Sequence, residues 1–198
     1  MANYDVTIEG VSRALQHGFT DKAQKQLDEG PAINIVGIDY DGEWLNTCHV
    51  TDDGEVFWPA NYVWAAMKKN ASAFKIPGKR GKTFKDAVTA YVVVEGLEDP
   101  DQLRTGLTLQ EDLGKNPLSP LYVDRQPVVI SRSRVMRERL GLNQGWKTSF
   151  TLETLEPIPP DILRNILELA GKSGIGDYRP RYGRFRVVEW AEAKDAKA

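Results

Sequence analysis

The chain has 198 residues, of which 41% are hydrophobic and 27% charged, enough apolar content for one sizeable core. No apolar run approaches the roughly 20 residues of a membrane-spanning helix, and no basic region followed by an apolar one opens the chain. We therefore expect a cytoplasmic protein without a membrane partner. With Cys48 as the only cysteine and His17 and His49 as the only histidines, we expect no disulfide, metal or other cofactor.

The net charge is −2, but the basic residues are concentrated in parts of the chain. Three windows, 68–85, 125–147 and 164–186, hold 19 of the 26 lysines and arginines and three acidic residues. The rest of the chain carries 7 basic and 25 acidic residues. This segregation predicts a basic groove on an acidic body, as nucleic-acid binding requires, although helix faces of ordinary proteins also segregate charge.

The N-terminal part of the chain predicts several short strands. Alternation over Tyr4 to Glu9 is typical of a first core strand. The polar stretch 10–30 is expected to be loop and irregular helix, and the apolar run 33–38 a strand. The runs 45–50 and 55–58 flank a Thr-Asp-Asp-Gly turn and together predict a hairpin.

A helix and a basic loop follow this hairpin. Residues 59–74 begin with a proline, which a first helical turn tolerates, and place apolar residues on one face, so they predict a helix. The helix leads into 75–82, a loop of cations and glycines with no acidic residue. Two interpretations stay open: a solvated flexible loop, or a loop that contacts phosphates through Lys79, Arg80 and Lys82.

The middle of the chain predicts a central strand and a long insertion. Residues 88–94 are apolar on both faces, as expected for a strand buried on both sides. Residues 95–120 are acidic, contain several prolines and glycines and have no clear period. Because this segment is longer than a plain connection within a compact domain, we expect an insertion with its own local structure.

A long hairpin is predicted between residues 127 and 154. Residues 127–136 read as one strand, in which Arg132 and Arg134 share a face. Glycines at 141 and 145 mark a turn. Residues 146–154 then alternate as a second strand, which we expect to pair with the first.

The C-terminal part predicts a helix, a glycine-rich loop and a final strand. A helix with one apolar face begins at Asp161 and leads into 171–184, where glycines and arginines alternate closely. Residues 184–190 read as a strand, and 191–198 are expected to fray.

The glycine-rich loop is the strongest candidate for a binding site. Guanidinium groups and glycine amides suit phosphate binding, and tyrosines interleaved with arginines suit base stacking. The residues singled out are Lys172, Gly174, Gly176, Tyr178, Arg179, Arg181, Tyr182 and Arg184. The alternative interpretation is a tight connection with solvated arginines and with aromatic residues that pack in the core.

Without the insertions, the predicted order is strand, helix, strand, strand, helix, strand, the split βαβ order of ferredoxin-like folds. We therefore predict an α+β, ferredoxin-like (RRM-like) antiparallel sheet with two helices, inserted hairpins and a glycine-rich loop before the last strand. One domain would span 1–190, with insertions at about 31–58 and 95–125 and a frayed tail over 191–198.

This order, together with two short motifs, resembles the RAMP superfamily of CRISPR-associated proteins, in particular the backbone subunits that polymerise along a guide RNA. The motifs are Phe57-Trp58-Pro59-Ala60 before the first helix and the stretch from Gly174 to Phe185, GIGDYRPRYGRF. The resemblance covers the topology of most of the chain, and its motifs are short and degenerate.

The resemblance implies that the glycine-rich loop and the basic loops beside the sheet hold an RNA backbone. It implies that an inserted element, 95–120 or the 41–58 hairpin, intrudes between bases. The residues that would line the RNA backbone are Lys172, Arg179, Arg181 and Arg184.

The sequence thus favours a non-enzymatic binder of single-stranded RNA or DNA that assembles with copies of itself or with other subunits of a ribonucleoprotein complex. Two alternatives stay open. One is a guide-processing endoribonuclease, as among RAMP relatives, with His17 as the general base. The other is a protein-interaction module, in which the acidic segment 95–113 and exposed tryptophans dock a partner and so mimic or block a CRISPR complex. The resemblance also leaves open a phage-borne or stand-alone relative that binds single strands or imitates a backbone subunit.

Overall fold

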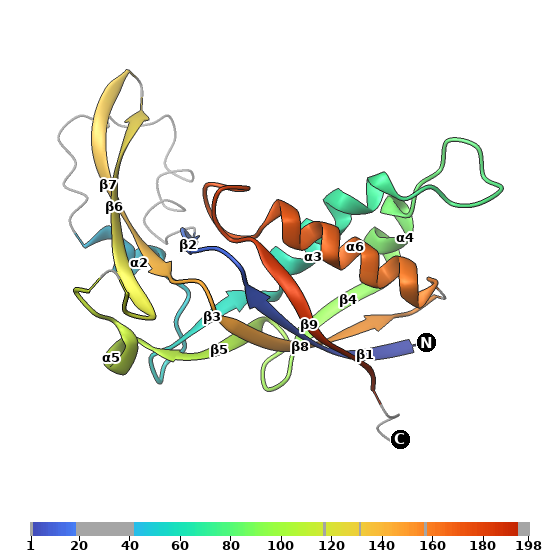
Figure 1. The fold of residues 1–198 in the computed structure, drawn as a ribbon, viewed down its shortest axis with the longest axis horizontal. Helices are drawn as coiled ribbons and strands as arrows, with labels where there is room; N and C mark the ends of the chain where they lie inside the picture. Colours follow the sequence, from blue (N-terminus) through green and yellow to red (C-terminus); the bar gives the residue numbers. More distant parts are fainter. Residues whose placement is uncertain (1, 19–41, 117, 131, 157, 194–198) are drawn as a thin grey trace, which may run out of the picture.

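A computed structural model describes residues 2–18, 42–116, 118–130, 132–156 and 158–193. The strand expected over 33–38 lies outside the described residues, as do most of the stretch 10–30 and the end of the tail. In the described ranges the chain forms a body of sheet and helices, from which one long hairpin projects (Figure 1). No helix within these ranges is long and apolar enough to cross a membrane.

A four-stranded sheet in the order β4-β8-β1-β9 forms one layer of the body, and each neighbouring pair in it is antiparallel (Figure 1). Its strands are β1 (Ala2–Gly10), β4 (Val92–Gly96), β8 (Lys147–Thr154) and β9 (Phe185–Glu192). Alternation in β1 buries Tyr4, Val6 and Ile8 on one face. The predicted first and last strands are therefore confirmed.

Two helices, α3 (Ala60–Asn70) and α6 (Pro160–Ser173), cover the same face of this sheet (Figure 1). Proline occupies the first position of α6, where no intrahelical N–H bond is lost. Leu163, Ile166, Leu167 and Ala170 recur at helical spacing and are fully buried. Both predicted helices are confirmed, and a short 3-10 turn, η1 (Ala71–Ala73), extends α3.

The central strand predicted over 88–94 is wrong in its first half and in its position. Lys85–Tyr91 form a helix, α4, in which the Val88 amide donates to the Phe84 carbonyl at 2.9 Å. The strand begins at Val92 and lies at the edge of the sheet. A short apolar run fits helix and strand equally well, because local periodicity cannot separate the two over so few residues.

The predicted hairpin over 127–154 is also wrong in its pairing. β6 (Leu121–Ile130) and β7 (Ser133–Leu142) pair with each other, from Leu121 opposite Leu142 to Ile130 opposite Ser133. Arg132 lies in the turn between them with φ 70°, so it does not share a strand face with Arg134. β7 also pairs with β2 (Ala14–Gln16), and β8 pairs with β1 and β4 instead.

The two predicted insertions join in a small sheet of their own. β3 (Glu55–Pro59) pairs with β5 (Gln102–Thr108), and α5 (Leu109–Asp112) follows. The turn before β3 is confirmed, since the Gly54 amide donates to the Thr51 carbonyl. The strand expected over 45–50 is wrong because α2 (Glu43–Thr47) begins after left-handed Gly42. β5, in the segment 95–120, therefore pairs with a strand of the other predicted insertion.

The connection from α6 to β9, which we call the Gly/Arg loop (residues 174–184), crosses the strand β2. The Gly183 amide donates to the Arg13 carbonyl at 2.7 Å, and the Ile175 amide donates to the Gly183 carbonyl at 2.9 Å. Gly183 has φ 73°, and a Cβ there would overlap the Ile175 backbone. This position therefore requires glycine both for its backbone conformation and for lack of space.

Replacing Gly183 by Ala should lower the free energy of unfolding by more than about 2 kcal/mol, because the backbone is strained and the Ile175 carbonyl is displaced. Gly78→Ala is the matched control, since Gly78 has a similar φ of 72° but open space around its Cβ position. It should cost about 1 kcal/mol. Urea unfolding measures both, and equal losses would show that the contact at Ile175 is unimportant.

Candidate nucleic-acid interface

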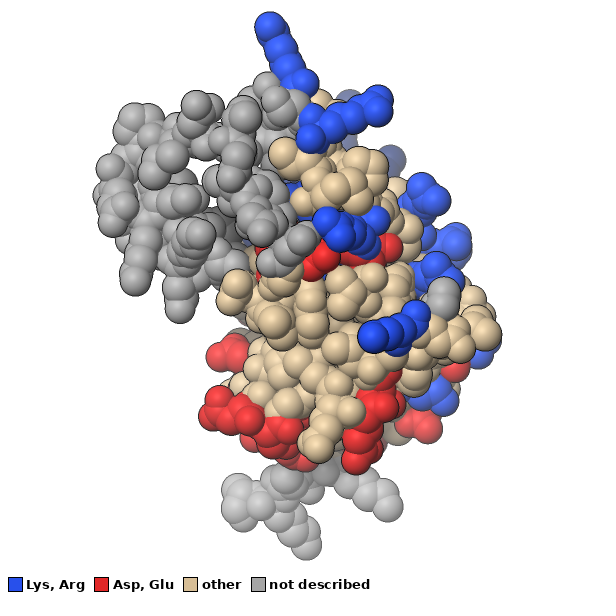
Figure 2. Space-filling view, turned by 90° about the vertical axis from the view of Figure 1, so that its left-hand side faces the viewer, with Lys and Arg blue, Asp and Glu red and all other residues tan. Residues whose placement is uncertain are grey.

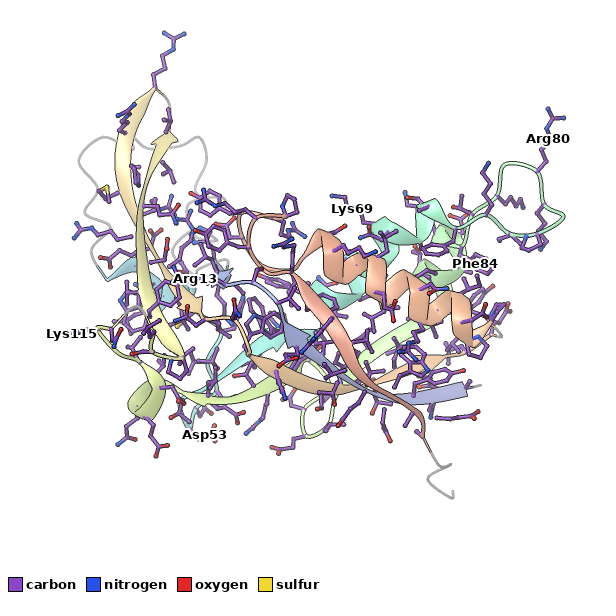
Figure 3. The ribbon with its side chains drawn as sticks, in the orientation of Figure 1. Arg13, Asp53, Lys69, Arg80, Phe84 and Lys115 are labelled. Carbon is purple, nitrogen blue, oxygen red and sulfur yellow. The ribbon has the colours of Figure 1, made fainter. Side chains whose placement is uncertain are left out.

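The basic residues predicted to bind lie along one side of the molecule. Lys69 and Arg80 point away from the sheet on the upper side, whereas Asp53 lies on the lower side (Figure 3). A perpendicular view shows lysines and arginines mostly in the upper half and acids mostly in the lower half (Figure 2). We call the side that carries the Gly/Arg loop, Lys69 and Arg80 the upper edge. The basic and acidic residues that are segregated along the sequence are therefore also separated on this face of the molecule (Figure 2).

The predicted binding residues form three separate groups on this side. One is the Gly/Arg loop, where Arg179, Arg181 and Arg184 are exposed, with exposed Lys172 just before it. The second is the exposed loop with Lys79, Arg80 and Lys82, at the other end of the helices (Figure 3). The third is the end of the projecting hairpin, with exposed Arg132 and Arg134. The three groups lie on the same side of the molecule but do not form one cluster.

The glycines of the Gly/Arg loop serve contacts within the protein. Gly174 and Gly176 have φ values of 78° and 77°. A Cβ on Gly176 would overlap the Leu15 carbonyl and crowd the Trp58 ring. The Asp177 amide donates to the same Leu15 carbonyl at 2.9 Å. The loop is therefore packed closely on β2, and this packing holds its arginines in place.

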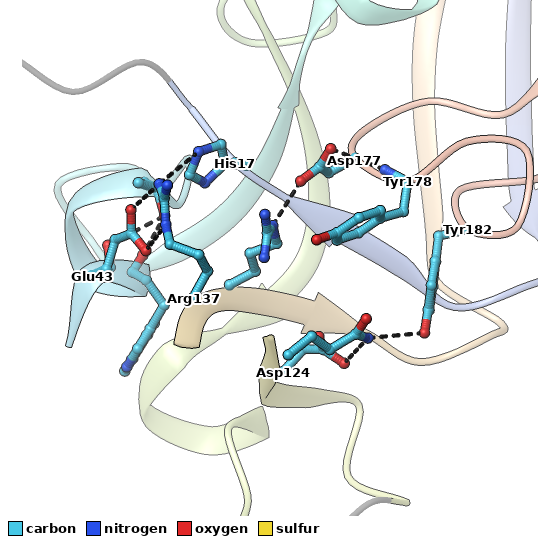
Figure 4. A network of polar contacts seen from close by, with 11 residues as sticks. His17, Glu43, Asp124, Arg137, Asp177, Tyr178 and Tyr182 are labelled. Carbon is cyan, nitrogen blue, oxygen red and sulfur yellow. Dashed lines mark hydrogen bonds and ion pairs between the residues drawn. The ribbon is translucent and has the colours of Figure 1, made fainter. Parts of the chain in front are cut away.

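An ion pair joins the Gly/Arg loop to the hairpin (Figure 4). Arg139 of β7 is 5% exposed, and its Nε donates to Asp177 Oδ2 at 2.6 Å. Its guanidinium carbon also lies 4.7 Å from the centre of the Tyr178 ring, a cation–π contact. Among the described residues, Arg139 Nη1 has no hydrogen-bond partner. Neither Arg139 nor this pairing was predicted from the sequence.

Two tyrosines of the Gly/Arg loop lie together beside the base of the hairpin. Their ring centres are 6.3 Å apart at an angle of 54°. Gln126 of β6 donates from Nε2 to the Tyr182 hydroxyl at 3.2 Å (Figure 4). Arg181 lies over the Tyr182 ring at 5.6 Å, and Tyr178 keeps 36% of its surface exposed. Flat side chains are thus held next to exposed cations.

His17, the candidate general base, belongs to a second polar group beside this ion pair (Figure 4). Its Nε2 lies 3.3 Å from Arg137 Nη2, and Arg137 is ion-paired with Glu43. Burial, followed by the charges of Arg139 and Arg137, lowers the pKa of His17 below its ordinary value of 6.5. The imidazole is therefore neutral near pH 7, but its Nε2 is already engaged with an arginine.

The other residues considered for chemistry have structural surroundings. His49 Nε2 is 3.1 Å from the Tyr62 hydroxyl, and burial lowers the pKa of this histidine. Burial raises the pKa of the Cys48 thiol, which disfavours the reactive thiolate. In the part of the chain that the structure describes, no group of three or more His, Cys, Asp or Glu side chains is placed to hold a metal ion.

The sequence matches no family model and no curated protein. Among solved structures, the chain is similar to one in a cryo-EM structure of the type III-B Cmr-beta bound to cognate target RNA. The TM-score is 0.60 at 10% sequence identity, over 98% of this chain and 61% of the other, so this chain spans about three fifths of that length. A chain of a type IV-B CRISPR complex matches with a TM-score of 0.46 and 11% identity, over 99% of this chain and 92% of the other.

The match with a TM-score of 0.60 establishes a likeness of fold. The chain shares its fold with a chain of the type III-B Cmr-beta bound to RNA. This likeness of fold agrees with the resemblance to RAMP-type CRISPR-associated proteins that the sequence suggested.

Asp177→Ala should lower the free energy of unfolding by about 2–4 kcal/mol, because it leaves the buried Arg139 charge without its carboxylate. Glu168→Ala is the control, since Glu168 forms an exposed ion pair with Arg164 one helical turn away at 3.2 Å. Its loss should cost about 0.5 kcal/mol or less. Urea unfolding of both variants tests the difference, and a small loss at Asp177 would contradict the assigned role of the pair.

Proposed function

We propose that this chain is a non-enzymatic subunit that binds a single strand of nucleic acid, RNA in preference to DNA, along its upper edge. The observation that carries the proposal is the Gly/Arg loop, which β2 and Arg139 hold in place while its arginines stay exposed beside two tyrosines. Arginines bind phosphates with two parallel hydrogen bonds, and tyrosine rings stack on bases without regard to sequence.

We infer that the main sheet with α3 and α6 is a ferredoxin-like unit. The strands follow in chain order β1, β4, β8 and β9; α3 stands in the connection from β1 to β4, and α6 in the connection from β8 to β9. The sheet order β9-β1-β8-β4 is the arrangement that a split βαβ unit produces. A single domain over 1–190 stays a prediction.

We further propose that the β6–β7 hairpin is the element that intrudes between bases. The segments 95–120 and 41–58, which the resemblance offered for this role, contribute the paired strands β5 and β3 to the body. The hairpin instead projects from the body, with Val129 69% and Met136 41% exposed (Figure 1). Apolar side chains on a projecting ribbon suit insertion between stacked bases.

Assembly along the strand, with copies of this chain or with other subunits, belongs to the same proposal. The structural neighbour with a TM-score of 0.60 comes from a multisubunit effector bound to RNA. A nucleic-acid strand that passes the Gly/Arg loop toward Arg80 would run beyond both ends of the upper edge, where neighbouring subunits could bind it (Figure 3).

The test is fluorescence anisotropy of a labelled single-stranded RNA across salt concentrations. The triple variant Arg179→Ala, Arg181→Ala, Arg184→Ala should bind more weakly. Its log–log salt slope should fall by about 2, since each phosphate contact on a single strand contributes about 0.7. The matched control changes Arg164, Arg186 and Lys147 to Ala; these are exposed cations outside the loop with the same total charge.

A control triple variant that weakens binding as much as the loop variant would refute the loop as the contact site. The same strand rerun on a gel after binding tests the enzymatic alternative. An intact RNA supports the proposal, whereas a shortened RNA would point to the endoribonuclease with His17 as its base. An absence of binding to both RNA and DNA would favour the protein-interaction module.

A further inference from the structure

A hollow of about 280 Å³ opens between the end of α3 and the start of the Gly/Arg loop. Two cations line it, Lys69 from α3 and Arg179 from the loop. Asn70, Ser173, Asp177 and Tyr178 also line it. The volume lies just below the usual range for small-molecule pockets, so it limits a ligand to about the size of one nucleotide.

A hydrogen bond between the two helices joins two of the residues that line this hollow. The Ser173 hydroxyl donates to Asn70 Oδ1 at 2.8 Å and so joins the last turn of α6 to the last residue of α3. Asn70 Nδ2 in turn donates to the Ala66 carbonyl at 2.8 Å. Because both side chains are held on each side of the hollow, its shape does not depend on the exposed cations.

The charge balance in the hollow favours an anion. Among the described residues that line it, the one acid is Asp177, and Arg139 pairs with its carboxylate at 2.6 Å from the side of the hairpin. Lys69 and Arg179 are exposed, and within the described residues neither forms an ion pair with an acid. Two cations with a neutralised acid between them suit one phosphate group.

The aromatic wall is held in position before any ligand arrives. The Tyr178 amide donates to Asp177 Oδ1 at 2.9 Å, and the Arg139 guanidinium covers the ring at 4.7 Å. A ring fixed in this way loses little conformational entropy when a base stacks on it. Stacking on an aromatic side chain contributes to binding whatever the base.

We propose that this hollow holds one nucleotide of the bound strand, with its phosphate between Lys69 and Arg179 and its base against Tyr178. The inference rests on the proposed function and adds Lys69, which no sequence pattern singled out. Lys69 also lies between the Gly/Arg loop and the loop that carries Arg80 (Figure 3). The nucleotide in the hollow is thus the link between these two basic groups.

The first test is ¹⁵N NMR of the full chain titrated with uridine 5′-monophosphate, uridine and inorganic phosphate. The monophosphate should shift the amides of Lys69, Gly174 and Gly176 at lower concentration than the other two probes do. Lys69→Ala should weaken this binding about fivefold. Lys68→Ala is the matched control, because the Lys68 ammonium lies over the Trp64 ring at 4.8 Å and does not line the hollow. It should change the affinity less than twofold.

The second test repeats the anisotropy assay with a short single-stranded RNA and the same two variants. Lys69→Ala should lower the log–log salt slope by about 0.7, and Lys68→Ala should lower it by clearly less. This inference is wrong, and the proposed function stands, if the RNA strand binds but both variants bind it alike. The same holds if the RNA strand binds but the monophosphate shifts no amide of the hollow.

If the monophosphate binds in the hollow but no RNA strand binds, the proposed function is wrong. The hollow then takes free nucleotides, which contradicts the strand-bound role given to it. If the wild-type chain binds neither the monophosphate nor the RNA strand, both this inference and the proposed function are wrong.

Discussion

The buried Arg139 guanidinium needs a negative partner, and the Asp177 carboxylate at 2.6 Å supplies it. A charge taken out of water is costly unless it is paired and hydrogen-bonded. This requirement ties the base of the β6–β7 hairpin to the Gly/Arg loop, although the two residues are 38 positions apart. It also places the guanidinium over Tyr178 and neutralises the one described acid of the hollow. The loop keeps exposed arginines beside fixed aromatic rings because Arg139 holds it there.

The elements that the sequence predicted correctly are those with long, unambiguous periods. β1 alternates over its whole length, and α6 repeats its apolar residues at helical spacing from Ile162 to Ala170. The sequence misplaced elements where tertiary contacts decide between two local options. Residues 88–91 are helical because Val88 packs in the core from α4, and the turn at Arg132 lacks the Gly, Asn or Pro that usually marks a hairpin.

Part of the candidate site could likewise be predicted from the sequence, and part could not. Composition alone located the exposed arginines and the tyrosines of the Gly/Arg loop, since Gly and Arg rarely alternate without a structural or binding reason. The contacts that position them were not predictable, because Arg139, Gln126 and Lys69 come from three other elements and no local pattern marks them. Gly176 approaches Leu15 of β2 and the Trp58 ring, whereas Gly174 and Gly183 approach the backbone of the loop itself. The loop that the sequence predicted to bind phosphates is packed on β2, and Arg179, Arg181 and Arg184 are exposed on it.

The central claim is that a single strand lies against the Gly/Arg loop on the upper edge. Ultraviolet cross-linking of a uridine-rich RNA to the full chain, followed by mass spectrometry of the cross-linked peptides, tests it directly. The account predicts cross-links at Tyr178 or Tyr182, with further ones near Lys69 or on the β6–β7 hairpin. Cross-links confined to the acidic lower side, around Asp53 and α5, would contradict it.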